Sequence, residues 1–116
     1  MAIKRFDVGP RMSQVVVHGN TVYLAGVVAD DAVPSVKSQT EQIVKKIDAL
    51  LAKAGTDKTK LLSANIWLSD IRTFSEMNAV WDAWVSAGNT PARATVEAKL
   101  AGPQYLVEIM VQAAID

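Results

Sequence analysis

The chain has 116 residues, and its 12 lysine and arginine residues balance 12 aspartate and glutamate residues, so the formal net charge is zero. A nucleic-acid backbone binder usually carries a basic excess, so this balance argues against a nucleic-acid partner. Cysteine is absent and only one histidine is present, which excludes disulfides, thiol nucleophiles, iron–sulfur clusters and a histidine-rich metal site. No apolar stretch approaches the roughly 18 residues of a membrane span, and the first residues lack the apolar region of a secretory signal. We therefore expect one cytoplasmic domain over residues 1–116 with no membrane partner.

The first predicted elements are strands. Residues 14–18 and 21–25 are rich in β-branched side chains, and the Gly19-Asn20 pair between them favours a two-residue turn. Gly26 ends the second strand at a point where another group can approach the backbone closely. A short strand over residues 3–6 is a further candidate. The sequence thus predicts a β-hairpin near the start of the chain.

Two helices and three strands follow. Residues 35–54 carry apolar side chains at three- and four-residue spacings, with Ser35 placed as N-cap and Gly55 as the stop. An alternation of side chains predicts a strand over 61–69. The spacing of Thr73 and Glu76 predicts a capping box at the start of a second helix, and Gly88 is expected to end that helix. Strands are predicted over 92–100 and 106–115. The order β-β-α-β-α-β-β indicates an α+β sandwich with both helices on one face of a mixed sheet. The other face needs a cover, which further copies of the chain in a homo-oligomer would supply.

Two charged residues are the main candidates for chemistry. Arg93 lies at the start of a predicted strand, among small or polar neighbours on its side, and its guanidinium offers the two-pronged donor that fits a carboxylate. Glu108 interrupts an apolar run, where burial would raise the pKa of a carboxyl and suit it to acid–base work. The plain alternatives are an exposed arginine on a sheet face and a glutamate at a sheet rim or in an ion pair. If the last two strands form a simple hairpin, both residues share one face, roughly 13 Å apart, so a joint site needs a ligand between them or a neighbouring subunit.

Other residues carry weaker signals. Asn78 lies beside the apolar stripe of the second helix, where its amide either enters a groove or bonds to the sheet. His18 adjoins the predicted turn and is better explained as a turn residue than as a general base. The three tryptophans are expected in the core or an interface. The sequence contains no phosphate-binding loop, zinc-protease motif or nucleophile elbow.

Several segments together resemble the Rid family, the RidA-like or YjgF-type imine and enamine deaminases. Residues 19–26 resemble the family's hairpin, and residues 74–84, which include Asn78, resemble the helix that carries the family asparagine. The most specific segments are 91–93 and 107–109, which match the family's separation of arginine and glutamate. The resemblance covers almost the whole chain.

The resemblance implies a chorismate-mutase-like α+β fold in a homotrimer, with the sheets forming an inner barrel and three clefts between subunits. It implies hydrolysis of 2-aminoacrylate or 2-imino acids to a 2-oxo acid and ammonia, without metal or cofactor. Arg93 would hold the substrate carboxylate and Glu108 would position or activate water. Asn78 and the backbone around Gly26 would line the cleft.

This chain departs from that pattern at three positions. Met12 stands where a tyrosine is often placed, within an Arg-Met-Ser-Gln segment over 11–14 that resembles a distinct branch. Ala25 stands where a serine is common, and Thr95 where a cysteine is common. We expect these residues to line the substrate cleft, with consequences for the preferred substrate. Two further functions stay open: a non-catalytic sensor that binds 2-oxo acids, and the ribonuclease or translation-inhibitor activity attached to some relatives, against which the zero net charge counts.

Overall fold

Six strands form one sheet in the computed structural model, which describes residues 2–116. They are β1 (Ile3–Val8), β2 (Ser13–His18), β3 (Thr21–Leu24), β4 (Leu61–Leu68), β5 (Ala92–Glu97) and β6 (Val107–Ala114). Their spatial order is β1-β2-β3-β6-β4-β5, and neighbours are antiparallel except β4 and β5, which are parallel. The predicted mixed sheet and the N-terminal hairpin are confirmed.

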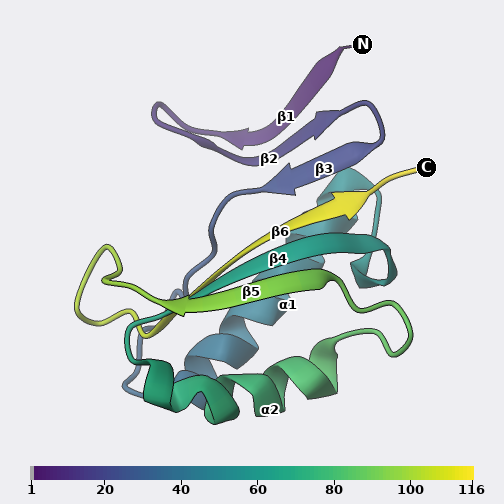
Figure 1. Cartoon of the computed structure of the whole chain (residues 1–116). Helices are drawn as coiled ribbons and strands as arrows, with labels where there is room; N and C mark the ends of the chain where they lie inside the picture. Colours follow the sequence, from purple (N-terminus) through teal and green to yellow (C-terminus); the bar gives the residue numbers. More distant parts are fainter. Residues whose placement is uncertain (1) are drawn as a thin grey trace.

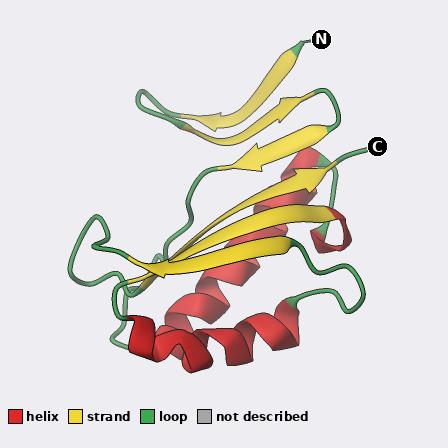
Figure 2. Ribbon diagram, in the orientation of Figure 1, coloured by secondary structure: helices red, strands yellow, loops and turns green. Residues whose placement is uncertain are grey.

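Two helices cover one face of this sheet, with α1 (Val36–Ala54) packed on β2, β3 and β6 and α2 (Phe74–Trp84) packed against α1 (Figures 1 and 2). Ser35 Oγ accepts a hydrogen bond from the Ser38 backbone N–H at 3.1 Å and so caps α1. Gly55 ends α1 in the left-handed conformation with φ 87°, which a side chain would disfavour. The predicted bounds of this helix are therefore confirmed.

The ends of α2 differ from the prediction. Thr73 makes no side-chain cap, because its hydroxyl donates instead to the Asp70 carbonyl at 2.7 Å. Asp70 caps a preceding 3-10 turn (Ile71–Thr73), and hydrogen bonds from the Arg72 side chain, then from its backbone, hold the pKa of the Asp70 carboxyl below its ordinary value. The helix ends at Trp84, whose carbonyl accepts from Lys58 Nζ, and Gly88 lies in the turn beyond it.

The core lies between the sheet and the helices. Alternate residues of the two central strands point toward the helices and are nearly inaccessible to solvent: Ala64, Ile66, Leu68, Val107, Ile109 and Val111. The intervening residues point to the other side of the sheet, which we call the open face, and are exposed or half-buried: Asn65, Trp67, Glu108, Met110 and Gln112. Within residues 2–116, no helix has the length and apolar character needed to cross a membrane. The cytoplasmic location stays a prediction.

The pairing of the last two strands corrects the sequence-based expectation. β4 lies between β5 and β6, so the two strands do not form a hairpin (Figure 1). Arg93 is level with Ala64 of β4, and Glu108 is level with Trp67 of the same strand. The chain between β5 and β6 passes from one side of β4 to the other. The composition of the turn at residues 101–104 does not predict this crossover.

Candidate active site

Arg93, the second residue of β5, points toward α2. Its guanidinium carbon lies 5.4 Å from the ring centroid of Trp81 and 5.7 Å from that of Phe74. Both aromatic side chains attract the cation through their π faces. The expectation of small or polar neighbours was wrong, because parallel pairing with β4 turns this face of β5 toward the helix. Sequence reasoning missed Phe74 and Trp81 as neighbours of the arginine, although their seven-residue spacing places them on one helix face.

Among residues 2–116, no acidic side chain compensates the charge of Arg93. None of the ion pairs formed among residues 2–116 includes it. Arg72, by comparison, forms an ion pair with Asp70 at 2.8 Å. Arg93 is half-buried, and its guanidinium is free to donate two hydrogen bonds to a carboxylate from outside the chain.

Two polar atoms near Arg93 also lack partners. Thr95 follows Arg93 on the same face of β5, and Asn78 lies on α2 one turn from both Phe74 and Trp81. Thr95 Oγ1 and Asn78 Oδ1 are buried without a hydrogen-bond partner. An unpaired buried polar atom costs about 1–3 kcal/mol, so native structures pair nearly all of them. We call Asn78, Arg93 and Thr95 the arginine half-site.

Glu108 lies on the open face, beside an irregularity between β3 and β6. Tyr23 pairs with Gln112 and Val27 with Ile109, so between these pairs β3 and its extension contain one residue more than β6. This bulge brings Gly26 against Glu108, and a Cβ at residue 26 would overlap Glu108 Oε2 and lie 3.1 Å from Cδ. Bulges often redirect side chains beside active sites. The close approach predicted at Gly26 is therefore confirmed, with the Glu108 carboxylate as the approaching group.

Ala25 and Met12 lie at the same end of the sheet as Gly26. The Ala25 N–H donates to the Gln14 carbonyl at 2.9 Å, two residues after Met12 in the neighbouring strand. Met12 is 48% exposed in the β1–β2 turn, which the Gly9 N–H closes by donating to its carbonyl at 2.8 Å. We call Met12, Ala25, Gly26 and Glu108 the glutamate half-site.

The two half-sites lie on opposite faces of the sheet. Arg93 faces the helices, whereas Glu108 faces away from them, and their Cα atoms are roughly 14 Å apart at standard strand spacing and rise. The expectation that both share one face was wrong, because it assumed direct pairing of β5 and β6. One small ligand therefore cannot contact both groups of the same chain.

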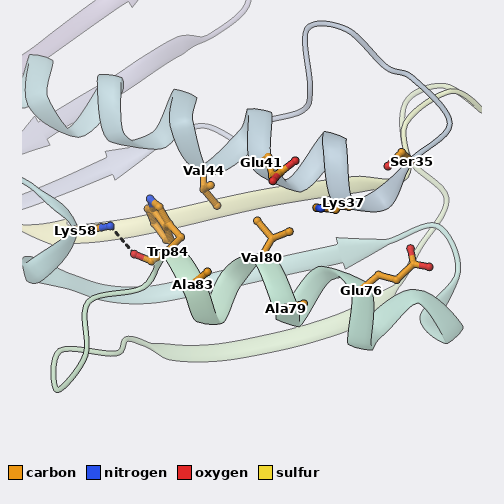
Figure 3. Close-up of a pocket in the computed structure, with 10 residues that line it drawn as sticks. All are labelled: Ser35, Lys37, Glu41, Val44, Lys58, Glu76, Ala79, Val80, Ala83 and Trp84. Carbon is orange, nitrogen blue, oxygen red and sulfur yellow. Dashed lines mark hydrogen bonds between the residues drawn. The ribbon is translucent and has the colours of Figure 1, made fainter.

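A separate groove lies between the two helices. It has a volume of about 800 Å³, and Figure 3 shows Val44 of α1 and Val80, Ala83 and Trp84 of α2 along it. No residue of either half-site lines this groove. His18 is exposed at the end of β2, and residues 2–116 hold no cluster of His, Asp or Glu side chains able to bind a metal ion.

The mixed sheet, the two helices and the two half-sites define a class of small α+β proteins. The sequence family described as Endoribonuclease L-PSP matches residues 3–115, and the chain belongs to this family, which also contains the YjgF, RutC and Rid proteins. The expected Rid-type family and fold are thus confirmed.

Individual relatives match along nearly the whole chain. The RutC family protein YoaB of Escherichia coli is 44% identical over 115 residues, which cover 99% of this chain and 100% of YoaB. Among solved structures, NMB1025 of Neisseria meningitidis, a YjgF family member, has a TM-score of 0.97 at 43% identity and covers 100% of this chain and 97% of its own. YyfA of Yersinia pestis, a Rid family protein, has a TM-score of 0.86 at 32% identity, with 93% and 90% covered.

Proposed function

We propose that this protein hydrolyses small 2-imino acids and their enamine tautomers to 2-oxo acids and ammonia, without a cofactor. Water adds to the C=N carbon, a proton moves to nitrogen, and the C–N bond breaks to release ammonia. The observation that carries the proposal is the Arg93 guanidinium, which lies over two aromatic rings and has no acidic partner among residues 2–116. Family membership supports a role in processing small molecules.

Arg93 would bind the substrate carboxylate. A guanidinium and a carboxylate form two parallel charge-assisted hydrogen bonds, which fix the orientation of the ligand as well as its position. Phe74 and Trp81 pack their ring faces against the guanidinium, which would limit its contact with water. The C=N carbon, directly bonded to the carboxylate, would then be held at a defined place in the cleft.

Glu108 would act on water. A carboxylate within hydrogen-bond reach of a water molecule can accept a proton as the oxygen attacks carbon, and can return it to the leaving nitrogen. Imine hydrolysis has a low intrinsic barrier, so orientation and one activated water suffice. Gly26 leaves the space in which the carboxylate lies, because any larger residue would place a Cβ there.

The site would form between subunits of a homotrimer. Arg93 and Glu108 lie on opposite faces within one chain, so a cleft containing both needs them from two copies. The open face carries half-buried Trp67 and Met110 and exposed Val96, which further copies would cover. A closed ring of three such contacts would give three equivalent clefts.

A binding protein for 2-oxo acids is the alternative that the same arginine half-site supports. The experiment that separates the two is a turnover assay in which an amino-acid oxidase or dehydratase generates the imine in place. Faster release of 2-oxo acid with the wild-type protein than without it, lost in Arg93→Ala, supports hydrolysis. Binding of 2-oxo acid with no acceleration would overturn hydrolysis in favour of the sensor.

The family description names an endoribonuclease, so RNA cleavage is the control activity. The zero net charge and the exposed position of His18 give it little support. Cleavage of RNA by the purified protein, abolished in His18→Ala, would replace the present proposal.

A further inference from the structure

Gln39 is a buried polar side chain that belongs to neither half-site. It lies in the first turn of α1 and has an exposed fraction of 0%. Its Nε2 donates to the Val33 carbonyl at 2.8 Å and to the Gln104 carbonyl at 3.0 Å, and its Oε1 accepts from the Leu106 N–H at 2.9 Å. Both amide hydrogens and the amide oxygen are therefore used, and one side chain joins two segments that are far apart in the sequence.

Both segments lead to the glutamate half-site. The chain that follows Gly26 leads to Val33, where Gln39 holds it. Leu106 directly precedes β6, and Glu108 follows it by two residues. Gln39 therefore binds the segment that comes after Gly26 and the segment that comes before Glu108.

A second contact joins the same two segments at the half-site itself. The Val27 N–H donates to the Ile109 carbonyl at 2.8 Å, and the Ile109 N–H donates to the Val27 carbonyl at 3.1 Å. Val27 follows Gly26 and Ile109 follows Glu108, so this bridge lies beside the contact between the glycine and the carboxylate. The backbone that carries Glu108 is thus held by the bridge on one side and by Gln39 on the other.

The pairing of buried backbone groups accounts for only part of this arrangement. The Val33 carbonyl already accepts from the Ser35 N–H at 2.8 Å, and Gln104 lies in an exposed turn that water can reach. Of the three partners, the Leu106 N–H depends most on Gln39. The amide therefore does more than satisfy one donor, because its three bonds together fix the distance between the two segments.

We infer that Gln39 is a positioning residue for Glu108: it holds the start of β6 against the chain that follows Gly26, so that the carboxylate stays where it can act on water. The inference rests on the proposed function, since it assumes that Glu108 activates water. None of the three hydrogen bonds of Gln39 reaches β4 or β5, so the arginine half-site does not depend on them. Loss of Gln39 should therefore slow hydrolysis without weakening the binding of a carboxylate to Arg93.

The test uses Gln39→Met, which keeps the length of the side chain and removes its three hydrogen bonds. Displacement of a catalytic group by about 1 Å can reduce the rate on the order of 10²-fold, so a smaller shift of Glu108 should lower kcat/KM for hydrolysis of 2-iminopropanoate by about tenfold. The Kd for pyruvate, measured by calorimetry, should stay at the wild-type value, because Arg93 binds its carboxylate.

Thr56→Val is the matched control. Thr56 is also buried, and its Oγ1 donates to the carbonyl of Ala114 at 2.7 Å, so it too bonds to the backbone of β6. This contact lies at the far end of the strand, roughly 20 Å from Glu108 at standard strand rise. The control should melt at a lower temperature than the wild type, as Gln39→Met should, but keep the wild-type kcat/KM.

Amide hydrogen exchange separates a local displacement from a general loss of stability. The Val27 and Ile109 N–H groups of the bridge should exchange faster in Gln39→Met than in Thr56→Val, because only the first variant loosens the two segments that the bridge joins. Equal exchange at these two amides in both variants would contradict the positioning role.

The kinetic outcomes decide the remaining cases. Wild-type kcat/KM in a folded Gln39→Met, an equal loss in Thr56→Val, or a parallel loss of pyruvate binding would overturn the inference and leave the proposed function in place. Gln39→Glu, which keeps the size of the side chain and an oxygen for the Leu106 N–H, is the second variant and should show the same separation of rate from binding. Failure of both variants to fold would assign Gln39 a structural role and overturn the inference. Absence of hydrolysis by the wild type would overturn the proposed function along with it.

Discussion

Arg93 and Glu108 lie on opposite faces of one sheet, in strands that β4 separates. Arg93 packs on the aromatic side chains of α2, and Glu108 packs on Gly26 at the bulge between β3 and β6. A monomer therefore presents Arg93 and Glu108 separately, and the proposed site, which contains both, would require two chains. This relationship explains why small-ligand chemistry in this fold would depend on assembly.

Gly26→Ala should reduce turnover and leave stability nearly unchanged. The added Cβ would overlap Glu108 Oε2, and the flexible glutamate side chain would move away at little cost to the fold. Displacement of a catalytic group by about 1 Å can reduce the rate on the order of 10²-fold. We expect kcat/KM for imine hydrolysis to fall by a factor of this order while the Tm changes little.

Gly102→Ala is the matched control. There too a Cβ would meet the end of a flexible side chain, that of Gln104, but in the β5–β6 connection and outside both half-sites. The control should keep full activity. Wild-type turnover in Gly26→Ala would contradict the assigned role of the Gly26–Glu108 contact.

Arg93→Ala should lose on the order of 10²-fold or more in kcat/KM, because a charge-assisted bidentate pair contributes about 1.5–3 kcal/mol and its loss leaves the substrate carboxylate unpaired. Arg93→Lys should recover only part of this, since an ammonium lacks the planar fork. The contacts with Phe74 and Trp81 contribute about 0.5–1 kcal/mol each, so the alanine variant should also melt a few degrees lower.

Arg72→Ala provides the comparison for this series. Arg72 is an exposed arginine with an ion pair to Asp70, so its removal changes the charge of the protein equally without touching either half-site. The rate of imine hydrolysis and the mass by light scattering are measured for the wild type, Arg93→Ala, Arg93→Lys and Arg72→Ala. Full activity in a folded Arg93→Ala protein would contradict the carboxylate anchor.

Much of the fold follows directly from the sequence. Ser35 and Gly55 mark the ends of α1 because capping chemistry is local, and Gly19-Asn20 marks the hairpin turn for the same reason. The second helix was less well bounded. Before this helix, Asp70 caps a separate 3-10 turn. At the end of the helix, the contact with Lys58 comes from a distant segment of the chain.

The composition of the two half-sites was predictable, but their arrangement was not. Arg93 and Glu108 are recognisable as polar interruptions in strand patterns, and Gly26 as a point of close approach. The relative faces depend on which strand lies between β5 and β6. That pairing is decided by the long-range packing of β4, which a local sequence pattern cannot predict.

The double variant Met12→Tyr with Ala25→Ser should increase activity on 2-iminopropanoate. Both residues lie at the end of the sheet that contains Gly26, and family resemblance implies hydroxyl groups at these positions. Added hydroxyls would orient the substrate or water at the glutamate half-site. An unchanged rate in a variant that folds and assembles normally would show that these hydroxyls do not limit turnover.

Val96→Asp should disrupt the trimer. Val96 is 50% exposed on the open face, level with Trp67, where a neighbouring copy would bury the new charge. Light scattering at micromolar concentration should give a trimer for the wild type and a smaller mass for the variant. Lys45→Glu, on the exposed side of α1, should remain trimeric. A wild-type monomer would contradict the proposed assembly.

Mixing two inactive variants tests the shared cleft most directly. Arg93→Ala and Glu108→Gln are unfolded together in equal amounts, refolded, and assayed for imine hydrolysis beside each variant refolded alone. If each cleft takes Arg93 from one subunit and Glu108 from the next, random assembly of a closed trimer leaves about a quarter of the clefts intact. We predict recovery of about that fraction of wild-type activity, whereas a mixture as inactive as either variant alone would contradict the account.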